Sequence, residues 1–251
     1  MSRESRVLLL VLRAASLVAF LALWEWAARV RISFNFPSPL ATLGALGELL
    51  GSGALPTATL TSAQSLLLGL GAATLFGVPF GLLMGVARPI GRVARVYFDL
   101  LIALPTAALI PLVILTFGIN IVSSAVIVFV FSVPFMAMNA YGGVRDVQPR
   151  LVEMARSFDA SGAQLFTRIV LPSALPMILA GLRYGLSRAF VGLIIAELLL
   201  SPFGLGRLIM ASRSMFEHDR MFATVLWTLI LAVGALTLLG RLEARLLRWR
   251  A

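Results

Sequence analysis

The chain has 251 residues, of which 60% are hydrophobic and 13% are charged, with a mean hydropathy of +0.98 and a formal net charge of +10. This composition excludes a soluble globular domain, and several stretches reach the roughly 20 apolar residues that a helix needs to cross a bilayer. Segments of alternating polarity separated by turns are missing from the sequence, which argues against a membrane barrel. We therefore expect an all-α, polytopic membrane protein with about six transmembrane helices.

The reactive residue types of the chain restrict its possible functions further. All 21 basic residues are arginines, cysteine is absent, and His218, which we place in the outer loop before the last span, is the one histidine. A P-loop needs a lysine for the β and γ phosphates, so any ATP that drives this protein must be bound by another chain. Disulfides, thiol chemistry and multi-histidine metal sites are excluded too. We predict no enzyme activity, and no metal or cofactor bound by this chain.

Six membrane spans and one interfacial helix are predicted in chain order. The spans cover about residues 7–28, 57–87, 96–117, 121–141, 173–200 and 221–240. Between the first two spans, Ser38 and Pro39 are residue types preferred at the N-cap and first position of a helix. We expect a short interfacial helix of about ten residues there, which Gly51 and Gly53 end.

Small residues and prolines predict how the spans are shaped. Gly77, Gly81 and Gly85 recur every four residues in the second span and leave a smooth stripe. Such a stripe lets another helix approach closely, either within the chain or across a dimer. Kinks are predicted in the third and fourth spans at Pro105, Pro111 and Pro134.

The distribution of arginine predicts the orientation. With the N-terminus inside, the short cytoplasmic segments carry 14 of the 21 arginines and the outside segments carry five. Because cytoplasmic loops are enriched in basic residues, we expect both termini in the cytoplasm. The basic residues form separated anchors instead of one stripe, so nucleic acid is not an expected partner.

A polar stretch, EMARSFDASGAQLFTRIVLP at 153–172, lies between the fourth and fifth spans. Pro149 suits a first helical turn, and apolar residues then recur on one face, at Leu151, Val152, Ala155 and Phe158. Charges of alternating sign, three positions apart, are expected to stabilise the exposed face, at Glu153, Arg156 and Asp159.

A second helix is predicted directly after the first. Ser161 and Gln164 have the spacing of a capping box, so this helix begins near Gly162 and continues until Pro172 interrupts it. The stretch is therefore a helix, a tight turn and another helix on the cytoplasmic side. From periodicity alone it is either an amphipathic loop on the membrane surface or an element that docks on a cytosolic partner.

The stretch resembles the EAA loop of binding-protein-dependent ABC importer permeases. That motif is Glu-Ala-Ala, a Gly four residues beyond the second Ala, and later Ile-x-Leu-Pro; the matching residues here are Glu153, Ala155, Ile169, Leu171 and Pro172. Met154 replaces the first Ala, and Asp159 replaces the Gly. The resemblance implies that residues 143–172 form a cytoplasmic coupling loop with Ile169, Leu171 and Pro172 as its framework. The residues it implies for contact with the ATPase are Glu153, Met154, Ala155, Arg156, Ser157, Phe158, Asp159 and Gly162.

Further stretches are similar to the nitrate, sulfonate and taurine permeases. They are FPSP at 36–39, LPTAALIPLVILTFGI at 104–119, ARSFDAS at 155–161, LPSALPMILAGLRYGL at 171–186, AEL at 196–198 and GLGRLI at 204–209. This resemblance implies a type I ABC importer permease fold in one domain over 1–251, with a core at about 57–247, in a bacterial inner membrane. The implied partners are a cytosolic ATPase dimer that holds ATP and Mg, a second permease copy in a homodimer, and an extracytoplasmic solute-binding protein. The implied solute is small and anionic or organic, such as nitrate, a sulfonate or taurine.

Polar residues within the spans are candidates for the translocation pathway, because charges in a bilayer are costly. Arg183, Tyr184 and Arg188 lie on the fifth span, where the arginines either line the path of an anion or stabilise packing. Glu197, nearer the outer end, either pairs with an arginine of a neighbouring helix or contributes to gating. Asn139 in the fourth span either bonds to a neighbouring helix or contacts the pathway.

Two other function classes were weighed. An ion-coupled secondary transporter normally carries its coupling ion on membrane carboxylates, and here only Glu197 is clearly within a span, with Asp99 near an interface. No inverted repeat is apparent in the sequence. A membrane enzyme would need paired carboxylates, a nucleophile elbow or a metal cluster, and the sequence contains none of these patterns.

Overall fold

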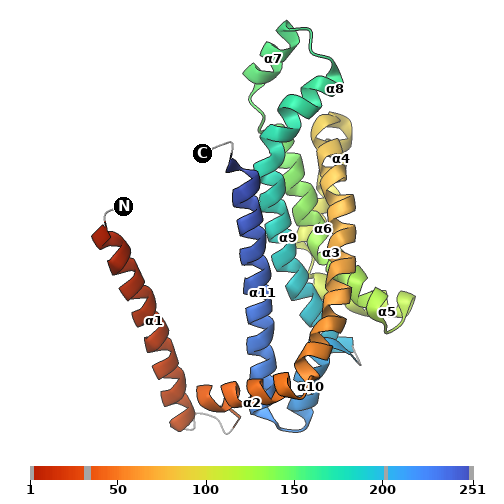
Figure 1. Ribbon diagram of the computed structural model, residues 1–251. Coiled ribbons are helices and arrows are strands. Elements are labelled where there is room, and N and C mark those ends of the chain that lie inside the picture. Colours follow the sequence, from red (N-terminus) through yellow and green to blue (C-terminus); the bar gives the residue numbers. More distant parts are fainter. Residues whose placement is uncertain (1–2, 31–34, 201–202, 249–251) are drawn as a thin grey trace.

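The computed structural model describes residues 3–30, 35–200 and 203–248 (Figure 1). Every regular element within these ranges is a helix, which confirms the all-α prediction. In chain order the elements are α1 (Arg3–Arg29), α2 (Pro39–Gly51), α3 (Ala54–Val86), α4 (Arg88–Ala103), the 3-10 turn η1 (Thr106–Leu109), α5 (Ile110–Phe117), α6 (Ile121–Arg145), α7 (Pro149–Ser157), α8 (Gly162–Leu165), the π turn η2 (Phe166–Val170), α9 (Leu171–Leu200), α10 (Gly204–Ser214) and α11 (His218–Leu246).

Five helical segments of the described chain are long and apolar enough to cross a membrane. They are α1, α3, α6, the joined α8–η2–α9 segment and α11. A sixth crossing is possible only as a bent pair, since α4 and the η1–α5 segment meet at 94°. The prediction of a single kinked helix over 96–117 is therefore wrong.

Two prolines explain the break in the third span. The ring of a proline disfavours the helical conformation of the residue before it. Leu104, which precedes Pro105, has an extended backbone with φ of −66° and ψ of 139°, and α4 ends at this point. Pro111 lies in the first turn of α5, where proline starts a helix instead of kinking one.

The packed centre of the bundle is α6, which contacts both α3 and α9 over much of its length. The glycine stripe of α3 faces α6. A Cβ atom at Gly81 would overlap the backbone of Ala137, and one at Gly85 would overlap the side chain of Val144. The close approach that these glycines predict is thus confirmed, and it occurs within the chain.

The interfacial helix α2 begins as predicted. The backbone N–H of Ala41 donates to the Ser38 hydroxyl at 3.2 Å, and Pro39 occupies the first turn. The helix is 13 residues long, and Gly53, with φ of +78°, turns the chain into α3. Before α2, the Trp24 indole N–H donates to the Pro37 carbonyl at 2.9 Å, which ties the end of α1 to this turn.

The prediction that Pro172 interrupts the helix after the polar stretch is wrong. The chain is helical from Gly162 to Leu199, and a π turn over Phe166–Val170 immediately precedes the proline. In this wider turn the Leu171 N–H donates to the carbonyl of Phe166, five residues earlier, where an α-helix would use the residue four earlier. Proline lacks an N–H and its ring needs space in the preceding turn, and a local π adjustment provides that space.

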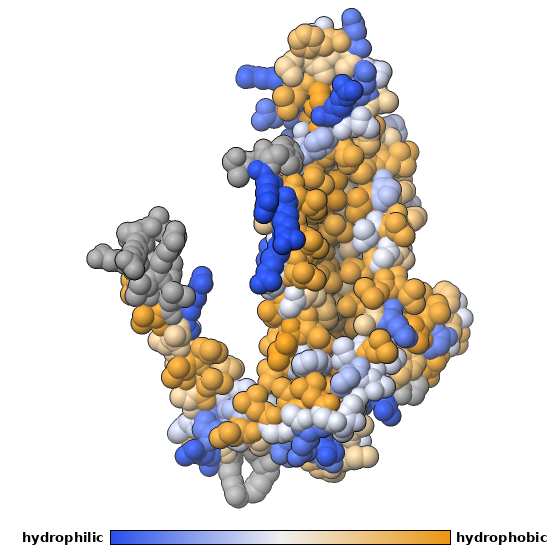
Figure 2. Space-filling view, in the orientation of Figure 1, coloured by the Kyte–Doolittle hydropathy of each residue, from blue (hydrophilic) through white to orange (hydrophobic). Residues whose placement is uncertain are grey.

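The two ends of the bundle differ. Figure 1 shows α7 at one end, here called the α7 end, and α2 and α10 at the opposite end, here called the α10 end. The start of α1 and the end of α11 both point toward the α7 end. Figure 2 shows hydrophobic side chains along the middle of the bundle and hydrophilic ones gathered toward its ends, as a membrane-spanning protein requires. The last span begins at His218, so this residue opens α11 and does not lie in the loop before it.

Candidate functional site

The helix α7 projects beyond the α7 end of the bundle (Figure 1). It is only partly covered: Ala155 is buried and Val152 is half-buried. Three apolar side chains beside Ala155 are exposed: Leu151 by 36%, Met154 by 52% and Phe158 by 81%. Their spacing of three and four residues places them on one face, and they are called the α7 apolar stripe below.

The predicted apolar face is only partly covered. Leu151 and Phe158 lie four and three residues from Ala155 and share its face, but they are exposed while Ala155 is buried. Packing against neighbouring elements decides which residues of an apolar face are covered. Sequence spacing alone therefore cannot identify the residues that stay free.

The turn after α7 explains how Asp159 can stand where the EAA motif has a glycine. Asp159 has a left-handed backbone, with φ of +53°. Its N–H donates to the Arg156 carbonyl at 3.0 Å, and the Ala160 N–H donates to the Ala155 carbonyl at 3.1 Å. This pair of bonds is the Schellman pattern that ends many helices. Aspartate is among the few side chains that adopt this conformation at modest cost, so the turn forms without glycine.

The second helix begins with the predicted capping box, which the structure confirms. The Gln164 N–H donates to the Ser161 hydroxyl at 3.3 Å, and the Ser161 N–H donates to the Gln164 side-chain oxygen at 2.9 Å. Gly162 has nothing within 4 Å of where a Cβ would lie, so it faces open space. Both sides of the short turn are therefore held by local hydrogen bonds.

The charges of the loop are exposed and unpaired. The expected stabilisation by alternating charges does not occur, since the described residues contain no ion pair between Glu153, Arg156 and Asp159. The Ser157 hydroxyl instead donates to the Glu153 carbonyl at 3.1 Å. These three charged side chains remain available to a partner.

At the other end of the bundle, Glu197 is 1% exposed and holds three helices together. The Ser62 hydroxyl of α3 donates to its carboxylate at 2.7 Å, and the Gly206 N–H of α10 donates to the other carboxylate oxygen at 2.9 Å. The Leu205 N–H donates in turn to the Ser62 hydroxyl at 2.9 Å. We call this group the Glu197 latch. The alternative in which Glu197 pairs with an arginine is wrong, because the Ser62 hydroxyl and the Gly206 N–H are its partners; a role in gating stays a prediction.

The latch explains why AEL and GLGRLI lie a few residues apart. The first N–H groups of α10 have no side-chain cap of their own, and a carboxylate is favourable at a helix N-terminus. Gly204 and Gly206 are necessary for this approach, because a Cβ at either position would overlap Glu197. Ser62 was not predicted from the sequence as part of this group. The signal that could have found it is the small-residue stripe of α3, which continues from Gly77 through Ala73 and Gly69 to Ser65 and Ser62.

Three of the pathway candidates on α9, Arg183, Tyr184 and Arg188, are exposed. The Arg188 guanidinium lies 4.9 Å from the centre of the Phe135 ring and lines a hollow of about 320 Å3 with residues of η1 and α6, among them Thr106 and Pro134. Arg183 and Tyr184 are exposed on the same helix, outside this hollow. Of these three residues, only Arg188 therefore lines a hollow that could hold a solute.

Within the described ranges, Asn139 forms no hydrogen bond with a neighbouring helix. Its amide donates to the Phe135 carbonyl of α6 itself at 2.7 Å. A Cβ at Gly181 of α9 would overlap the Cβ of Asn139, so the two helices pack closely at this point. The residue contributes to the contact between α6 and α9.

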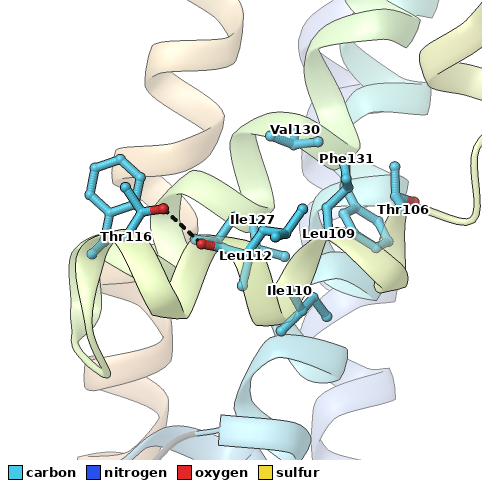
Figure 3. Close-up of a pocket in the computed structure, with 10 residues that line it drawn as sticks. Thr106, Leu109, Ile110, Leu112, Thr116, Ile127, Val130 and Phe131 are labelled. Atoms are coloured by element: carbon cyan, nitrogen blue, oxygen red, sulfur yellow. Dashed lines mark hydrogen bonds between the residues drawn. The ribbon is translucent and has the colours of Figure 1, made fainter.

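A second hollow, of about 200 Å3, lies between α5 and α6 (Figure 3). Figure 3 shows Leu109, Leu112, Ile127 and Phe131 around it. The Thr116 hydroxyl donates to the Leu112 carbonyl at 2.8 Å. This lining is unsuited to a charged solute, in contrast to the adjoining hollow that contains Arg188.

A bundle of membrane-crossing helices with an exposed helix projecting from one end has the form of a transport subunit. Within the described ranges, no group of three His, Asp or Glu side chains is placed to hold a metal ion. The profile of the family "Binding-protein-dependent transport system inner membrane component" matches residues 77–248, and the chain belongs to this family. It is an ABC importer permease, and nothing supports the ion-coupled alternative.

Similar proteins agree with this assignment. The taurine transport system permease protein TauC of Escherichia coli (strain K12) is 31% identical over 245 residues, which cover 95% of this chain and 89% of TauC. A putative aliphatic sulfonates transport permease protein, SsuC of Bacillus subtilis (strain 168), is 32% identical over 220 residues, covering 85% and 78%. The fold resembles an inward-facing structure of the MetNI methionine ABC transporter with a TM-score of 0.60 at 19% identity, over 76% of this chain and 93% of that one. The predicted type I importer fold is thus confirmed.

Proposed function

We propose that α7 is the coupling helix through which a cytosolic ATPase dimer, which holds ATP and Mg, drives this permease. The observation that carries the proposal is the α7 apolar stripe. Leu151, Met154 and Phe158 project into solvent beyond the bundle, beside the unpaired charges of Glu153 and Arg156. An apolar helix face ringed by charges fits a groove on a protein, and the charges disfavour burial in lipid.

The path from α7 into the membrane supports this role. The Schellman turn and the capping box join α7 rigidly to α8, and the helix then continues without a break through Ile169, Leu171 and Pro172 into α9. A displacement of α7 is therefore passed to the helix that carries both Arg188 and Glu197. In this scheme residues 143–172 are the coupling loop of a single permease domain spanning 1–251.

The position of the coupling helix at one end of the bundle assigns the remaining partners to the two sides of the membrane. The α7 end lies in the cytoplasm of a bacterial inner membrane with both termini, and the α10 end faces an extracytoplasmic solute-binding protein. A second copy of the chain completes the pathway. At the α10 end, Arg220 forms exposed ion pairs with Glu217 at 3.2 Å and with Glu48 of α2 at 3.6 Å, so α2 and α11 present charged side chains on the same outer surface.

The proposed solute is a small organic anion of the sulfonate or taurine type. Relatives at 31–32% identity are named for taurine and aliphatic sulfonates. Arg188 in its hollow of about 320 Å3 offers a guanidinium, which binds tetrahedral oxyanions in a fork geometry. Nitrate would be bound by the same group.

Co-purification with the ATPase tests the coupling assignment. Phe158→Asp places a charge at the most exposed position of the α7 apolar stripe and should lower ATPase binding at least about tenfold, because burying an unpaired carboxylate is costly. Phe216→Asp is the matched control, since Phe216 is 77% exposed at the α10 end. Equal ATPase binding by both variants would contradict the proposal.

A further inference from the structure

Four arginines line one open hollow at the α7 end of the bundle. The hollow has a volume of about 190 Å3 and lies where α4 crosses α3 and meets the last turn of α6. Its lining consists of Met84, Arg88, Arg92, Arg95, Tyr141 and Arg145. No acidic residue is among these lining residues, so the hollow is strongly electropositive.

The fold assembles this cluster from two helices. Arg88, Arg92 and Arg95 recur at spacings of four and three residues, which places them on one face of α4. A Cβ at Gly91 would overlap the Met84 carbonyl, so α4 lies directly against α3 at this point. Arg145 comes from the last turn of α6 and completes the group.

The charges of this hollow are largely unneutralised. Arg95 pairs with Asp99 at 3.3 Å, and that pair is exposed to solvent. Arg88, Arg92 and Arg145 form no ion pair with any described residue. Like charges four residues apart, such as Arg88 and Arg92, destabilise a helix unless something neutralises them. A bound anion would do so.

We propose that this hollow binds the phosphate of an anionic phospholipid headgroup. Guanidinium groups bind phosphate oxygens through paired, charge-assisted hydrogen bonds. The adjoining face of α4 exposes Val93, Tyr97 and Leu100, which recur at spacings of four and three residues and offer an apolar track for acyl chains. A soluble phosphate would use the arginines but gain nothing from that track, which is why the lipid is favoured. The site is independent of the coupling role of α7.

Lipid binding to the intact permease–ATPase complex in neutral phosphatidylcholine nanodiscs tests the proposal. Fluorescent phosphatidylglycerol should bind more tightly than fluorescent phosphatidylcholine. Arg88→Gln with Arg92→Gln should weaken phosphatidylglycerol binding about tenfold or more. The control, Arg241→Gln with Arg245→Gln, removes two exposed arginines from α11 at the same end and should leave binding within about twofold.

Several results would contradict the proposed lipid site. No preference of the wild-type complex for phosphatidylglycerol, or an equal loss in both double variants, would overturn the site, because a diffuse basic surface explains both. Displacement by inorganic phosphate at the concentration at which short-chain phosphatidylglycerol competes would overturn the lipid assignment. Co-elution of the ATPase with each variant verifies folding, and failure of this binding test leaves the coupling test on Phe158 unaffected.

Discussion

Replacing Ser62 by alanine should loosen the α10 end of the bundle. Its hydroxyl donates to the Glu197 carboxylate at 2.7 Å and accepts from the Leu205 N–H at 2.9 Å, so one substitution removes two hydrogen bonds at a buried site. The Leu205 N–H loses the Ser62 hydroxyl as its acceptor, and the carboxylate loses its side-chain donor while the Gly206 N–H remains. Both losses weaken the attachment of α10 to α3 and α9.

The loss in the free energy of unfolding can be bounded from these hydrogen bonds. Side-chain hydrogen bonds between membrane helices average about 0.6 kcal/mol, which gives about 1 kcal/mol for two. A buried N–H left without an acceptor costs about 1–3 kcal/mol, which sets the upper bound near 3 kcal/mol. With a shift of about 2–4 °C per kcal/mol for a chain of this size, the melting temperature should fall by about 2–12 °C.

A matched control lies one turn along the same helix. Ser65 is also fully buried, but its hydroxyl has no hydrogen-bond partner among the described residues. Ser65→Ala should therefore leave the melting temperature unchanged or raise it slightly, because an unsatisfied buried hydroxyl is removed. The assay is thermal unfolding of the purified protein in detergent, followed by loss of the monodisperse size-exclusion peak. Equal shifts for the two variants would refute the latch.

Three further predictions concern the coupling loop and the pathway. Because Asp159 has φ of +53°, Asp159→Gly should stabilise the turn after α7, and Asp159→Val should destabilise it by about 1–2 kcal/mol. Protection of the loop from proteolysis measures both effects. Equal protection of the two variants would contradict the left-handed turn. Glu153→Lys should leave the helices inserted but uncouple ATP hydrolysis from uptake, so normal reconstituted transport would contradict the coupling role. Arg188→Ala should lower uptake of a sulfonate about tenfold or more while ATPase binding persists. Arg183→Ala, on the same helix but outside the hollow, is the control and should leave uptake unchanged. Unchanged uptake by the Arg188 variant would exclude Arg188 from the pathway.

Helix starts could be predicted from the sequence because their causes are local. Ser38 caps α2 and Pro149 opens α7 as expected. The capping box of Ser161 and Gln164 also forms as expected. In each case the groups that interact lie within three or four residues of one another, so the residue types alone decide the geometry.

Proline effects were harder to predict because the same residue has several outcomes. Pro105 breaks the third span, Pro111 starts α5, and Pro172 is accommodated by a π turn. The missing N–H is common to all three positions. Which outcome follows depends on whether neighbouring helices hold the chain straight, as they do where α9 packs along α6.

The sequence by itself determined that the chain crosses a membrane, that it cannot supply the P-loop lysine, and that a paired-helix loop lies between two spans. Those conclusions need only composition and short-range pattern. The tertiary structure decided what Glu197 contacts, since Ser62 lies 135 positions away in sequence, and which apolar residues of α7 are free. It also assembled the arginine hollow from α4 and α6. Contacts of this kind depend on how each helix is rotated against its neighbours, and that rotation is set by the packing of the whole bundle.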